Sequence, residues 1–259
     1  MSSSSSPQHS TNPPAIEASH EISGWSFSCR KAPAMSSAQR DQLSAELHLA
    51  PAIPLPEVVF ADSALQVDYP ACGLSIHFDA REALHTWMQD HAGATDHWKP
   101  SSFDFTYSTT YMGTVAHEGS PVKIDTTSEK LPLDKLQQQV AILFYDRVIL
   151  FEDDIRDLGE IYIEVRARAM EFGFLLLCRY YCRIDDKNIK LVDSRYYHEF
   201  GDDFVWRDHE IREASIPDLK KVLRSKHIEQ QDAPIELSAD IVYGMLQPTS
   251  SHTEKIHLA

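Results

Sequence analysis

The middle of the chain alternates between apolar and polar positions over long stretches. From Ile161 to Met170 every second residue is aliphatic, and the residues between them are polar or charged. A period of two over this length predicts a β-strand with one buried face. Phe172–Ile184 is apolar on both faces, which indicates a central strand. Asp185–Asn188 supplies turn-forming residues, so we expect Ile189–Phe200 to return as the hairpin partner.

Further strands are predicted from shorter patterns. Phe204–Arg212 can follow the hairpin as another antiparallel strand, and Phe103, Phe105, Tyr107 and Tyr111 share a period-two face. Three short apolar runs are additional strand candidates: Val58–Phe60, Leu65–Tyr69 and Leu74–Phe78. Leu143–Ile155 stays open, because its spacing of apolar residues fits neither a strand nor a helix.

Helices are fewer. Asp79 and Glu82 have the spacing of a capping box, so a helix is expected from there to about Gln89. Ser215 and Asp218 mark a second helix that ends near Arg224. Weaker patterns predict two more helices: Met35–Leu47 and Leu133–Gln139.

These elements predict an α+β fold with one domain. Its core is an antiparallel β-sheet, or two such sheets packed together, with a few flanking helices. Residues 1–20 are rich in Ser and Pro and have little to bury, so we expect them to be disordered. Residues 21–226 form the predicted domain. Residues 227–259 carry scattered apolar side chains, and we expect them to be loosely ordered.

Composition narrows the classes of partner. The chain of 259 residues has a net charge of −15, which repels phosphate backbones and anionic lipid. We therefore expect neither nucleic acid nor a membrane surface as partner. Phe172–Cys178 is the longest apolar stretch and is too short to span a bilayer. The Ser-rich start lacks an apolar run. With no secretory leader expected, the four cysteines fit free thiols in a reducing compartment.

The residue spacings propose no metal, cofactor or catalytic centre. Cys178 and Cys182 share a strand face at roughly 13 Å, too far apart for one zinc ion, and we expect buried thiols there. No phosphate-binding glycine loop and no nucleophile elbow occur. The carboxylates between Glu152 and Glu160 are the strongest alternative, since paired carboxylates can hold magnesium or do acid–base work. We expect a solvated acidic run instead, and hence not an enzyme.

Basic and aromatic residues gather in the central hairpin. Arg179 and Arg183 share one strand face with a tyrosine between them, and Arg195 lies among tyrosines in the next strand. An arginine of this kind can clamp a peptide carboxylate or an acidic side chain. The alternative is an internal ion pair, such as Arg195 with Asp193. The sequence leaves both interpretations open.

Several segments resemble the Tip-forty-one-like (TIPRL) family of type 2A phosphatase regulators. They are FDFTYSTTYMGT from Phe103, ILFYDRVILFEDDIRDLG from Ile142, and FLLLCRYYCRIDDKNIKLVDSRYYHE from Phe174. Weaker similarity extends the resemblance to about Ile22–Glu213. Three positions depart from the family pattern: Phe105 stands in place of Trp, Glu171 in place of Pro and Ser194 in place of Thr.

This resemblance implies a binding protein that restrains the catalytic subunits of protein phosphatases of types 2A, 4 and 6. It also implies a role in TOR nutrient signalling, links to the alpha-four/Tap partner, and a place in the cytoplasm and also the nucleus. A scaffold that joins proteins without changing phosphatase turnover is a third hypothesis. The phosphatase's C-terminal tail is expected to bind on the hairpin face, bordered by other elements. The expected residues are Asp193, Arg195, Tyr197 and Glu199, with Arg179, Arg183, Glu82 and Ile142 around them.

Overall fold

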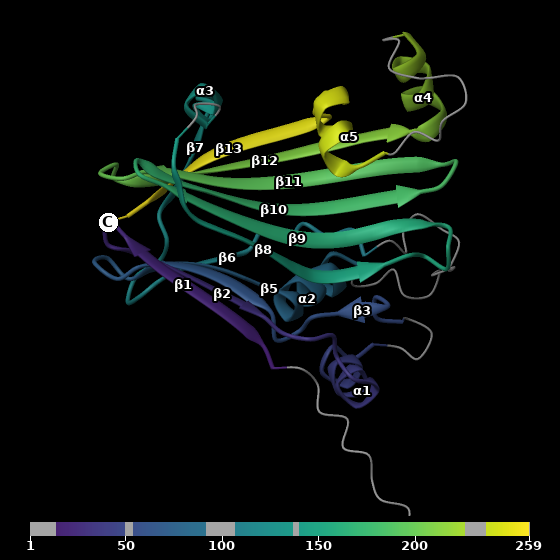
Figure 1. The fold of residues 1–259 in the computed structure, drawn as a ribbon, viewed down its shortest axis with the longest axis horizontal. Helices are drawn as coiled ribbons and strands as arrows, with labels where there is room; N and C mark the ends of the chain where they lie inside the picture. The colour runs from purple at the N-terminus through teal and green to yellow at the C-terminus, as the bar shows by residue number, and fades with distance from the viewer. Residues whose placement is uncertain (1–13, 50–53, 92–106, 137–139, 226–236, 259) are drawn as a thin grey trace, which may run out of the picture.

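The computed structural model describes residues 14–49, 54–91, 107–136, 140–225 and 237–258. Within these residues the chain forms two antiparallel sheets, of five and eight strands, and a few helices (Figure 1). The predicted α+β class with an antiparallel core is therefore confirmed, in its two-sheet form. No helix in these ranges has the length and apolar character needed to cross a membrane.

The small sheet comes from the N-terminal half of the chain. Its strands lie in the order β1-β2-β4-β5-β6. Their bounds are β1 Ile16–Ile22, β2 Trp25–Lys31, β4 Ala64–Tyr69, β5 Leu74–Asp79 and β6 Thr114–His117. The two predicted strands in this region correspond to β4 and β5, which pair with each other. Both show the alternation of buried and half-buried residues that the sequence pattern indicated.

The large sheet is built around the predicted hairpin. Its order is β3-β8-β9-β10-β11-β12-β13-β7. The bounds of its strands are β3 Val58–Val59, β7 Ile124–Thr127, β8 Ile142–Asp153, β9 Gly159–Met170, β10 Gly173–Ile184, β11 Asn188–Glu199, β12 Phe204–Ser215 and β13 Ser250–His257. Strands β9, β10 and β11 are consecutive neighbours, as predicted, and β12 follows them.

The segment Leu143–Ile155, whose sequence pattern was ambiguous, lies mostly in strand β8. Its pairing with β9 is shifted between Ile142 and Phe144 and again between Ile149 and Phe151. A bulge adds one residue to a strand and reverses the inside–outside order beyond it. Two such shifts make the apolar spacing fit neither a period of two nor a helical period, although the segment is a strand.

The predicted strand through Tyr107 and Tyr111 is wrong for the part that the structure describes. Residues 107–113 have no regular structure, and Tyr107 has a φ of 49°, which no strand residue adopts. Both tyrosines are buried all the same. Their spacing reflects burial of a loop, where the Tyr111 hydroxyl accepts a hydrogen bond from the backbone N–H of Asp79 at 3.0 Å. Phe103 and Phe105 lie outside the described residues.

Five helices complete the described elements. They are α1 Ser37–Glu46, α2 Ala80–Asp90, α3 Leu133–Leu136, α4 Ile216–Ser225 and α5 Ala239–Met245. The Asp79 side chain caps α2 by accepting from the backbone N–H of Glu82 at 2.9 Å, which is one half of the predicted capping box. The other half is not formed, because the Asp79 N–H donates to the Tyr111 hydroxyl instead. The Oγ of Ser215 accepts from the backbone N–H of Asp218 at the start of α4. These caps satisfy N–H groups that lack a partner within the helix.

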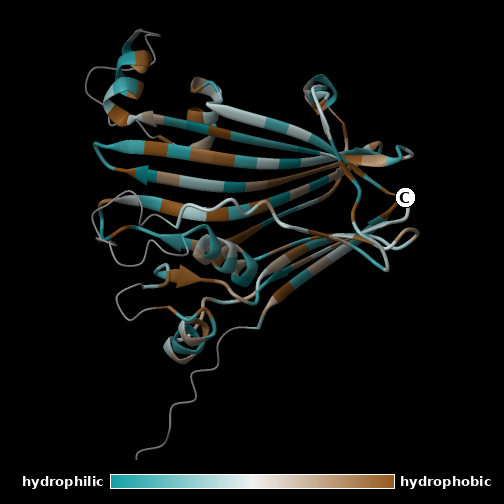
Figure 2. Ribbon diagram, turned by 180° about the vertical axis from the view of Figure 1, so that it is seen from behind, coloured by the Kyte–Doolittle hydropathy of each residue, from teal (hydrophilic) through white to brown (hydrophobic). Residues whose placement is uncertain are grey.

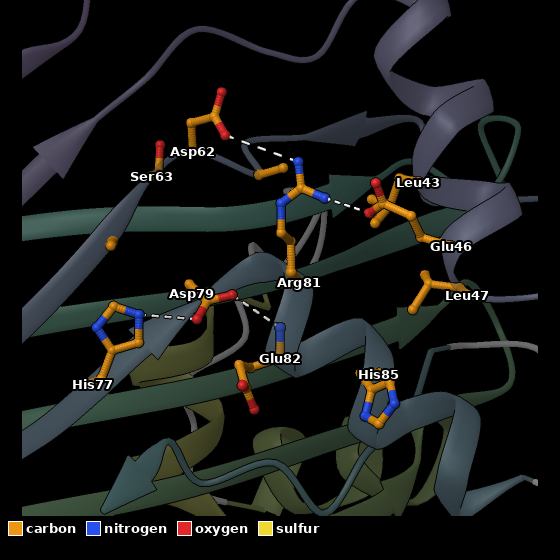
Figure 3. Close-up of a pocket in the computed structure, with 12 residues that line it drawn as sticks. Leu43, Glu46, Leu47, Asp62, Ser63, His77, Asp79, Arg81, Glu82 and His85 are labelled. Carbon is orange, nitrogen blue, oxygen red and sulfur yellow. Dashed lines mark hydrogen bonds and ion pairs between the residues drawn. The ribbon is translucent and has the colours of Figure 1, made fainter. Parts of the chain in front are cut away.

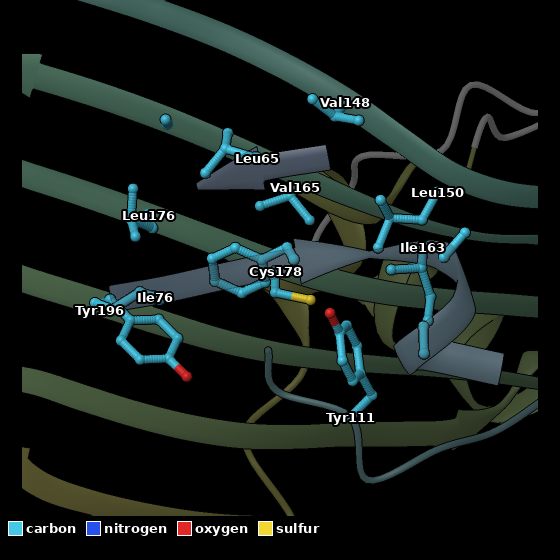
Figure 4. Packing of buried hydrophobic residues seen from close by; sticks show 14 of the residues in the cluster. Leu65, Ile76, Tyr111, Val148, Leu150, Ile163, Val165, Leu176, Cys178 and Tyr196 are labelled. Carbon is cyan, nitrogen blue, oxygen red and sulfur yellow. The ribbon is translucent and has the colours of Figure 1, made fainter. Parts of the chain in front are cut away.

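The main core lies between the two sheets. Figure 4 shows Leu65 and Ile76 of the small sheet facing Val165 and Leu176 of the large sheet. Helix α2 lies between the sheets where they diverge (Figure 1), and its Trp87 is fully buried there. The long strands alternate between apolar and polar residues (Figure 2), so the large sheet also has an outward face that carries polar side chains.

The C-terminal segment differs from the expectation of loose order. Strand β13 pairs with β12 on one side and with β7 on the other. It was missed because its outward side chains are polar and its buried residues include only one aliphatic, Ile256, beside Thr253. Residues 226–236 lie outside the described residues, as do residues 1–13 of the predicted disordered tail. Strand β1 begins at Ile16 and pairs in the small sheet, so ordered structure starts before the predicted domain boundary at residue 21.

Candidate partner-binding site

The outward face of the large sheet carries most of the predicted site. Alternation along β11 directs Asp193, Arg195 and Tyr197 to this face, while Ser194 and Tyr196 point to the core side. Arg179 on β10 lies directly opposite Asp193. The predicted sharing of a face by Asp193, Arg195, Tyr197 and Glu199 is thus confirmed, with Arg179 beside them.

Arg195 and Asp193 form an internal ion pair. The guanidinium donates to the Asp193 carboxylate at 2.5 Å and to the Glu210 carboxylate at 2.8 Å. Asp193 is fully buried and also accepts two hydrogen bonds from Arg179, at 2.7 and 2.8 Å. Arg195 is 8% exposed. Of the two sequence interpretations, the geometry favours the internal pair, because both terminal nitrogens of the guanidinium already donate to carboxylates of the sheet.

Charge pairing outweighs burial at these arginines. Burial disfavours the charged form of Arg195, but Asp193 and Glu210 more than offset that effect, and its pKa lies above the usual value. The same competition acts on the Glu210 carboxyl. Burial raises its pKa, but the hydrogen bonds from Arg212 and Arg195 lower it by more, so the pKa of Glu210 lies below its usual value. Each group therefore keeps its charge because its partner is present.

Tyr197 and Glu199 are tied to the segment around α3. The Tyr197 hydroxyl donates to Glu199 at 3.0 Å, and Lys135 donates to the same carboxylate at 2.6 and 2.8 Å. The ion pair with Lys135 holds the pKa of Glu199 below its usual range. The Tyr197 ring is buried against Leu131 and Trp206. Only the Glu199 end of this group reaches solvent.

Ile142 and Glu199 lie in one row across the sheet. Ile142 pairs with Met170, Met170 with Gly173, and Gly173 with Glu199. Three strand-to-strand steps place the two ends of the row about 14 Å apart. Ile142 is 51% exposed. We call this line the Ile142–Glu199 row; it presents an exposed aliphatic group at one end and a carboxylate at the other.

Two of the predicted site residues, Arg183 and Glu82, lie away from the rest. Arg183 lies at the far end of β10, where it pairs with Asp185 at 2.9 Å and Glu160 at 3.8 Å. Glu82 lies on α2, where its carboxylate accepts from Thr114 Oγ1 at 3.3 Å. The expectation that the Glu82 helix borders the arginine site is wrong, because α2 packs on the core side of the large sheet and Arg195 faces outward.

Glu82 instead lines an open cleft of about 560 Å³ between α1, α2 and the C-terminal end of β5. Its charged groups are paired with one another (Figure 3): Arg81 meets Glu46 at 2.8 Å, and His77 meets Asp79 at 2.9 Å. The hydrogen bond to Asp79 raises the pKa of His77. A ligand that binds there through Arg81 or Asp79 would have to displace these pairs.

Carboxylates of the predicted acidic run, Glu152–Glu160, accept hydrogen bonds from the backbone in and beside the turn between β8 and β9. The Asp153 side chain accepts from the backbone N–H groups of Glu57 and Ile155, and Asp154 accepts from that of Arg156. Three consecutive residues, Ile155 to Asp157, have φ angles of 54°, 59° and 63°. Among the described residues, no group of three or more His, Cys, Asp or Glu side chains could hold a metal ion. The four cysteines are free thiols.

The sequence interpretation missed the residues that cover the arginines. Asp240 and Tyr243 come from α5, in the segment that we expected to be loosely ordered. The Asp240 carboxylate pairs with Arg179 at 2.5 Å, and the Tyr243 ring centroid lies 4.6 Å from the Arg195 guanidinium. Ser238 followed by Asp240 is a helix-start signal, but a segment of only seven residues is too short for its periodicity to place a helix.

Comparison with known proteins gives a consistent set of relatives. A family model described as "TIP41-like family" matches residues 58–220. The chain is 31% identical over 225 residues to the human TIP41-like protein, covering 80% of this chain and 81% of that one. It is 27% identical to the Dictyostelium discoideum TIP41-like protein, over 92% of each chain. It is 30% identical to the Saccharomyces cerevisiae "Type 2A phosphatase activator TIP41", over 82% of this chain and 67% of that one.

Proposed function

Because the chain belongs to the TIP41-like family, we propose that it is a non-catalytic regulator of type 2A protein phosphatases that acts by binding their catalytic subunits. The observation that carries the proposal is the extent of the family match. Residues 58–220 contain β8 to β12 whole, and with them the outward face of the large sheet. The name of the Saccharomyces cerevisiae relative contains the phosphatase class.

The proposed contact is the Ile142–Glu199 row and the exposed start of β8. Ile142, Leu143 and Tyr145 are 51%, 41% and 58% exposed. Adjacent exposed aliphatic and aromatic side chains are typical of protein interfaces, where they supply most of the buried apolar area. The Glu199 carboxylate and Lys135 at the other end can add directed polar contacts. This placement supports a protein partner.

The finer parts of the proposal come from the family resemblance. We propose that phosphatases of types 4 and 6 bind as well as type 2A, that the phosphatase's C-terminal tail contributes to the contact, and that an alpha-four/Tap-type protein joins the pathway. We propose that binding restrains dephosphorylation as part of TOR nutrient signalling, in the cytoplasm and nucleus. The word activator in the relative's name makes the direction of the effect the first thing to measure.

A dephosphorylation assay with a purified type 2A catalytic subunit tests the proposal. We expect turnover to fall as the chain is added, and the chain alone to show none. Unchanged turnover with retained binding would favour the scaffold hypothesis, and raised turnover would contradict restraint. Turnover by the chain alone that is lost in Asp153→Asn would favour the hydrolase hypothesis.

Two matched variants test the contact. Ile142→Asp places a charge in the proposed interface at a half-exposed position, so it should stay folded and lose its effect on turnover. Leu158→Asp is the control, since Leu158 is 61% exposed in the turn at the opposite end of the sheet. Equal effects of both variants would remove the Ile142–Glu199 row from the account.

A further inference from the structure

Helix α5 places an aromatic ring over three buried arginines. The Tyr243 ring centroid lies 4.0 Å from the guanidinium of Arg212, 4.6 Å from that of Arg195 and 5.9 Å from that of Arg179. These arginines, on β12, β11 and β10, are 6%, 8% and 3% exposed. We call them the arginine row. A cation above an aromatic face is attracted by the ring, most strongly where water is excluded.

The second group that α5 supplies is a carboxylate. Asp240 pairs with Arg179 at 2.5 Å and with Arg166 at 3.8 Å. On β8 and β9, Arg147 and Arg166 both form ion pairs with Glu164. Asp240 links this group to the arginine row. Burial raises the pKa of Asp240, but the bond from Arg179 lowers it further, so the carboxylate stays charged.

Charge balance on this face depends on Asp240. The connected ion pairs join five arginines of the described sheet: Arg147, Arg166, Arg179, Arg195 and Arg212. The sheet itself contributes four carboxylates: Glu164, Asp193, Asp208 and Glu210. Asp240 is the fifth, and it comes from α5. A buried cation without a partner is costly. The Asp240 side chain is 70% exposed and Arg179 also pairs with Asp193, so a ligand that replaces α5 keeps the full set of ion pairs when it carries a carboxylate.

Helix α5 is attached to the sheet by a small apolar contact and a few polar ones. Leu237, Ala239 and Val242 are buried in a cluster with Tyr181, Ile189 and Leu191 of the sheet. The helix has seven residues, too few to be stable alone, and the Ser238 side chain makes no capping hydrogen bond. Besides the Asp240 ion pairs, two hydrogen bonds from sheet side chains reach the backbone at either end of α5: the Tyr181 hydroxyl donates to the carbonyl of Leu237, and Arg212 Nε donates to that of Leu246 at 2.9 Å. The strand that follows, β13, has its own pairing. Displacement of α5 would therefore expose this apolar contact but would leave the strand pairing of the sheet intact.

The arginine row continues into the proposed contact. Arg195, Tyr197 and Glu199 follow one another on the outward face of β11. Four residues along a strand span about 13 Å, so Arg195 lies about that far from the Glu199 end of the row, with the buried Tyr197 between them. An extended segment of about four residues from a partner seated on the row would span this distance and reach Tyr243 and Asp240.

We propose that the arginine row is a peptide-binding site and that α5 occupies it as an internal ligand. Its competing ligand is a phosphatase segment with a carboxylate and an aromatic ring about three residues apart, the spacing of Asp240 and Tyr243. This rests on the proposed function for the identity of the partner. While α5 occupies the arginine row, the phosphatase segment cannot bind there. The apparent affinity of the chain for this segment is therefore the intrinsic affinity multiplied by the fraction of molecules in which α5 is displaced.

The site is tested with a peptide supplied in trans to the full-length chain. The probe is a fluorescein-labelled peptide with the sequence of residues 237–247, LSADIVYGMLQ, and binding is read by fluorescence anisotropy. The Asp240→Ala/Tyr243→Ala variant should bind it at least tenfold more tightly than the unaltered chain. Ile241→Ala, at an exposed position of the same helix, should bind it like the unaltered chain.

A second peptide tests the chemistry. In it the aspartate is replaced by asparagine and the tyrosine by alanine, and the opened variant should bind it at least tenfold more weakly than the first peptide. Equal binding of the two peptides would overturn the proposal, as would equal binding of the first peptide to all three proteins. If the double variant does not fold, Asp240→Asn keeps the packing, and it should shift binding in the same direction by a smaller factor. No shift in that variant would overturn the proposal.

The partner is tested with the phosphatase catalytic subunit. The opened variant should bind it at least threefold more tightly than the unaltered chain. Peptide binding with no gain in phosphatase affinity would overturn the phosphatase as competing ligand. If the unaltered chain does not bind phosphatase at all, the proposed function fails, while the peptide titrations still decide whether α5 is an internal ligand.

Discussion

Replacing Arg195 by alanine separates an internal ion pair from a clamp for a partner. The change removes hydrogen bonds to Asp193, Glu210 and, at 3.3 Å, Asp208. Removing one member of a buried pair costs about 3–5 kcal/mol, because a buried charge is left behind. Here Asp193 keeps both bonds from Arg179, and Glu210 keeps its bond from Arg212. We therefore expect the lower end, about 3 kcal/mol.

For a chain of this size about 1 kcal/mol shifts the melting temperature by about 2–4 °C. Arg195→Ala should then melt about 6–12 °C below the unaltered protein in a thermal scan followed by circular dichroism. Arg183→Ala is the matched control on the neighbouring strand, since its partners Asp185 and Glu160 are half-exposed. Such surface pairs contribute about 0–1 kcal/mol. If the two variants melt within about 2 °C of each other, the reasoning about the buried network is refuted.

Three further changes have directions set by the structure. Gly173→Ala should lower the free energy of unfolding by about 1–3 kcal/mol in urea denaturation, because its Cβ would lie 2.1 Å from the carbonyl oxygen of His198; an unchanged midpoint would contradict this packing. Asp157→Gly should raise that free energy by up to about 1 kcal/mol, since φ is 63° there and glycine adopts it without strain; a less stable variant would argue against strain in the turn. The pKa of Glu210 is lowered in the folded chain, so its contribution to stability is present above the ordinary value of about 4.5 and is lost as pH falls below it. Glu210→Gln should flatten that loss when unfolding is measured between about pH 3.5 and pH 6, and an identical acid profile would exclude this role.

The strands that sequence reasoning located have clear local signals: β9 alternates strictly, β10 is a long apolar run, and turn-forming residues separate β10 from β11. Strands β9, β10 and β11 pair with their neighbours in sequence across tight turns, so local pattern and final structure agree. Strand β8 was ambiguous because two bulges reverse its pattern. The partners of β13 could not be foreseen, since its pairing with β7 joins residues more than 120 positions apart, and no local pattern encodes such a contact.

The site was predicted in part for the same reason. Alternation correctly placed Asp193, Arg195, Tyr197 and Glu199 on one face. Whether that face is open depends on α3 and α5, and α5 lies some 45 residues further along the chain. A short helix with only two fully buried residues, Ala239 and Val242, gives little signal of its own. Arg195 therefore read equally well as a clamp and as a structural residue until Asp240 and Tyr243 were in place.

The central claim is that this chain binds a type 2A phosphatase catalytic subunit through the outward face of its large sheet. Isothermal titration of the purified catalytic subunit into the full-length chain measures this most directly. The account predicts saturable binding with a Kd of about 1 μM or tighter, weakened at least tenfold by Ile142→Asp and unchanged by Leu158→Asp. A folded chain that gives no saturable heat up to about 100 μM, or binding that Ile142→Asp leaves intact, would contradict it.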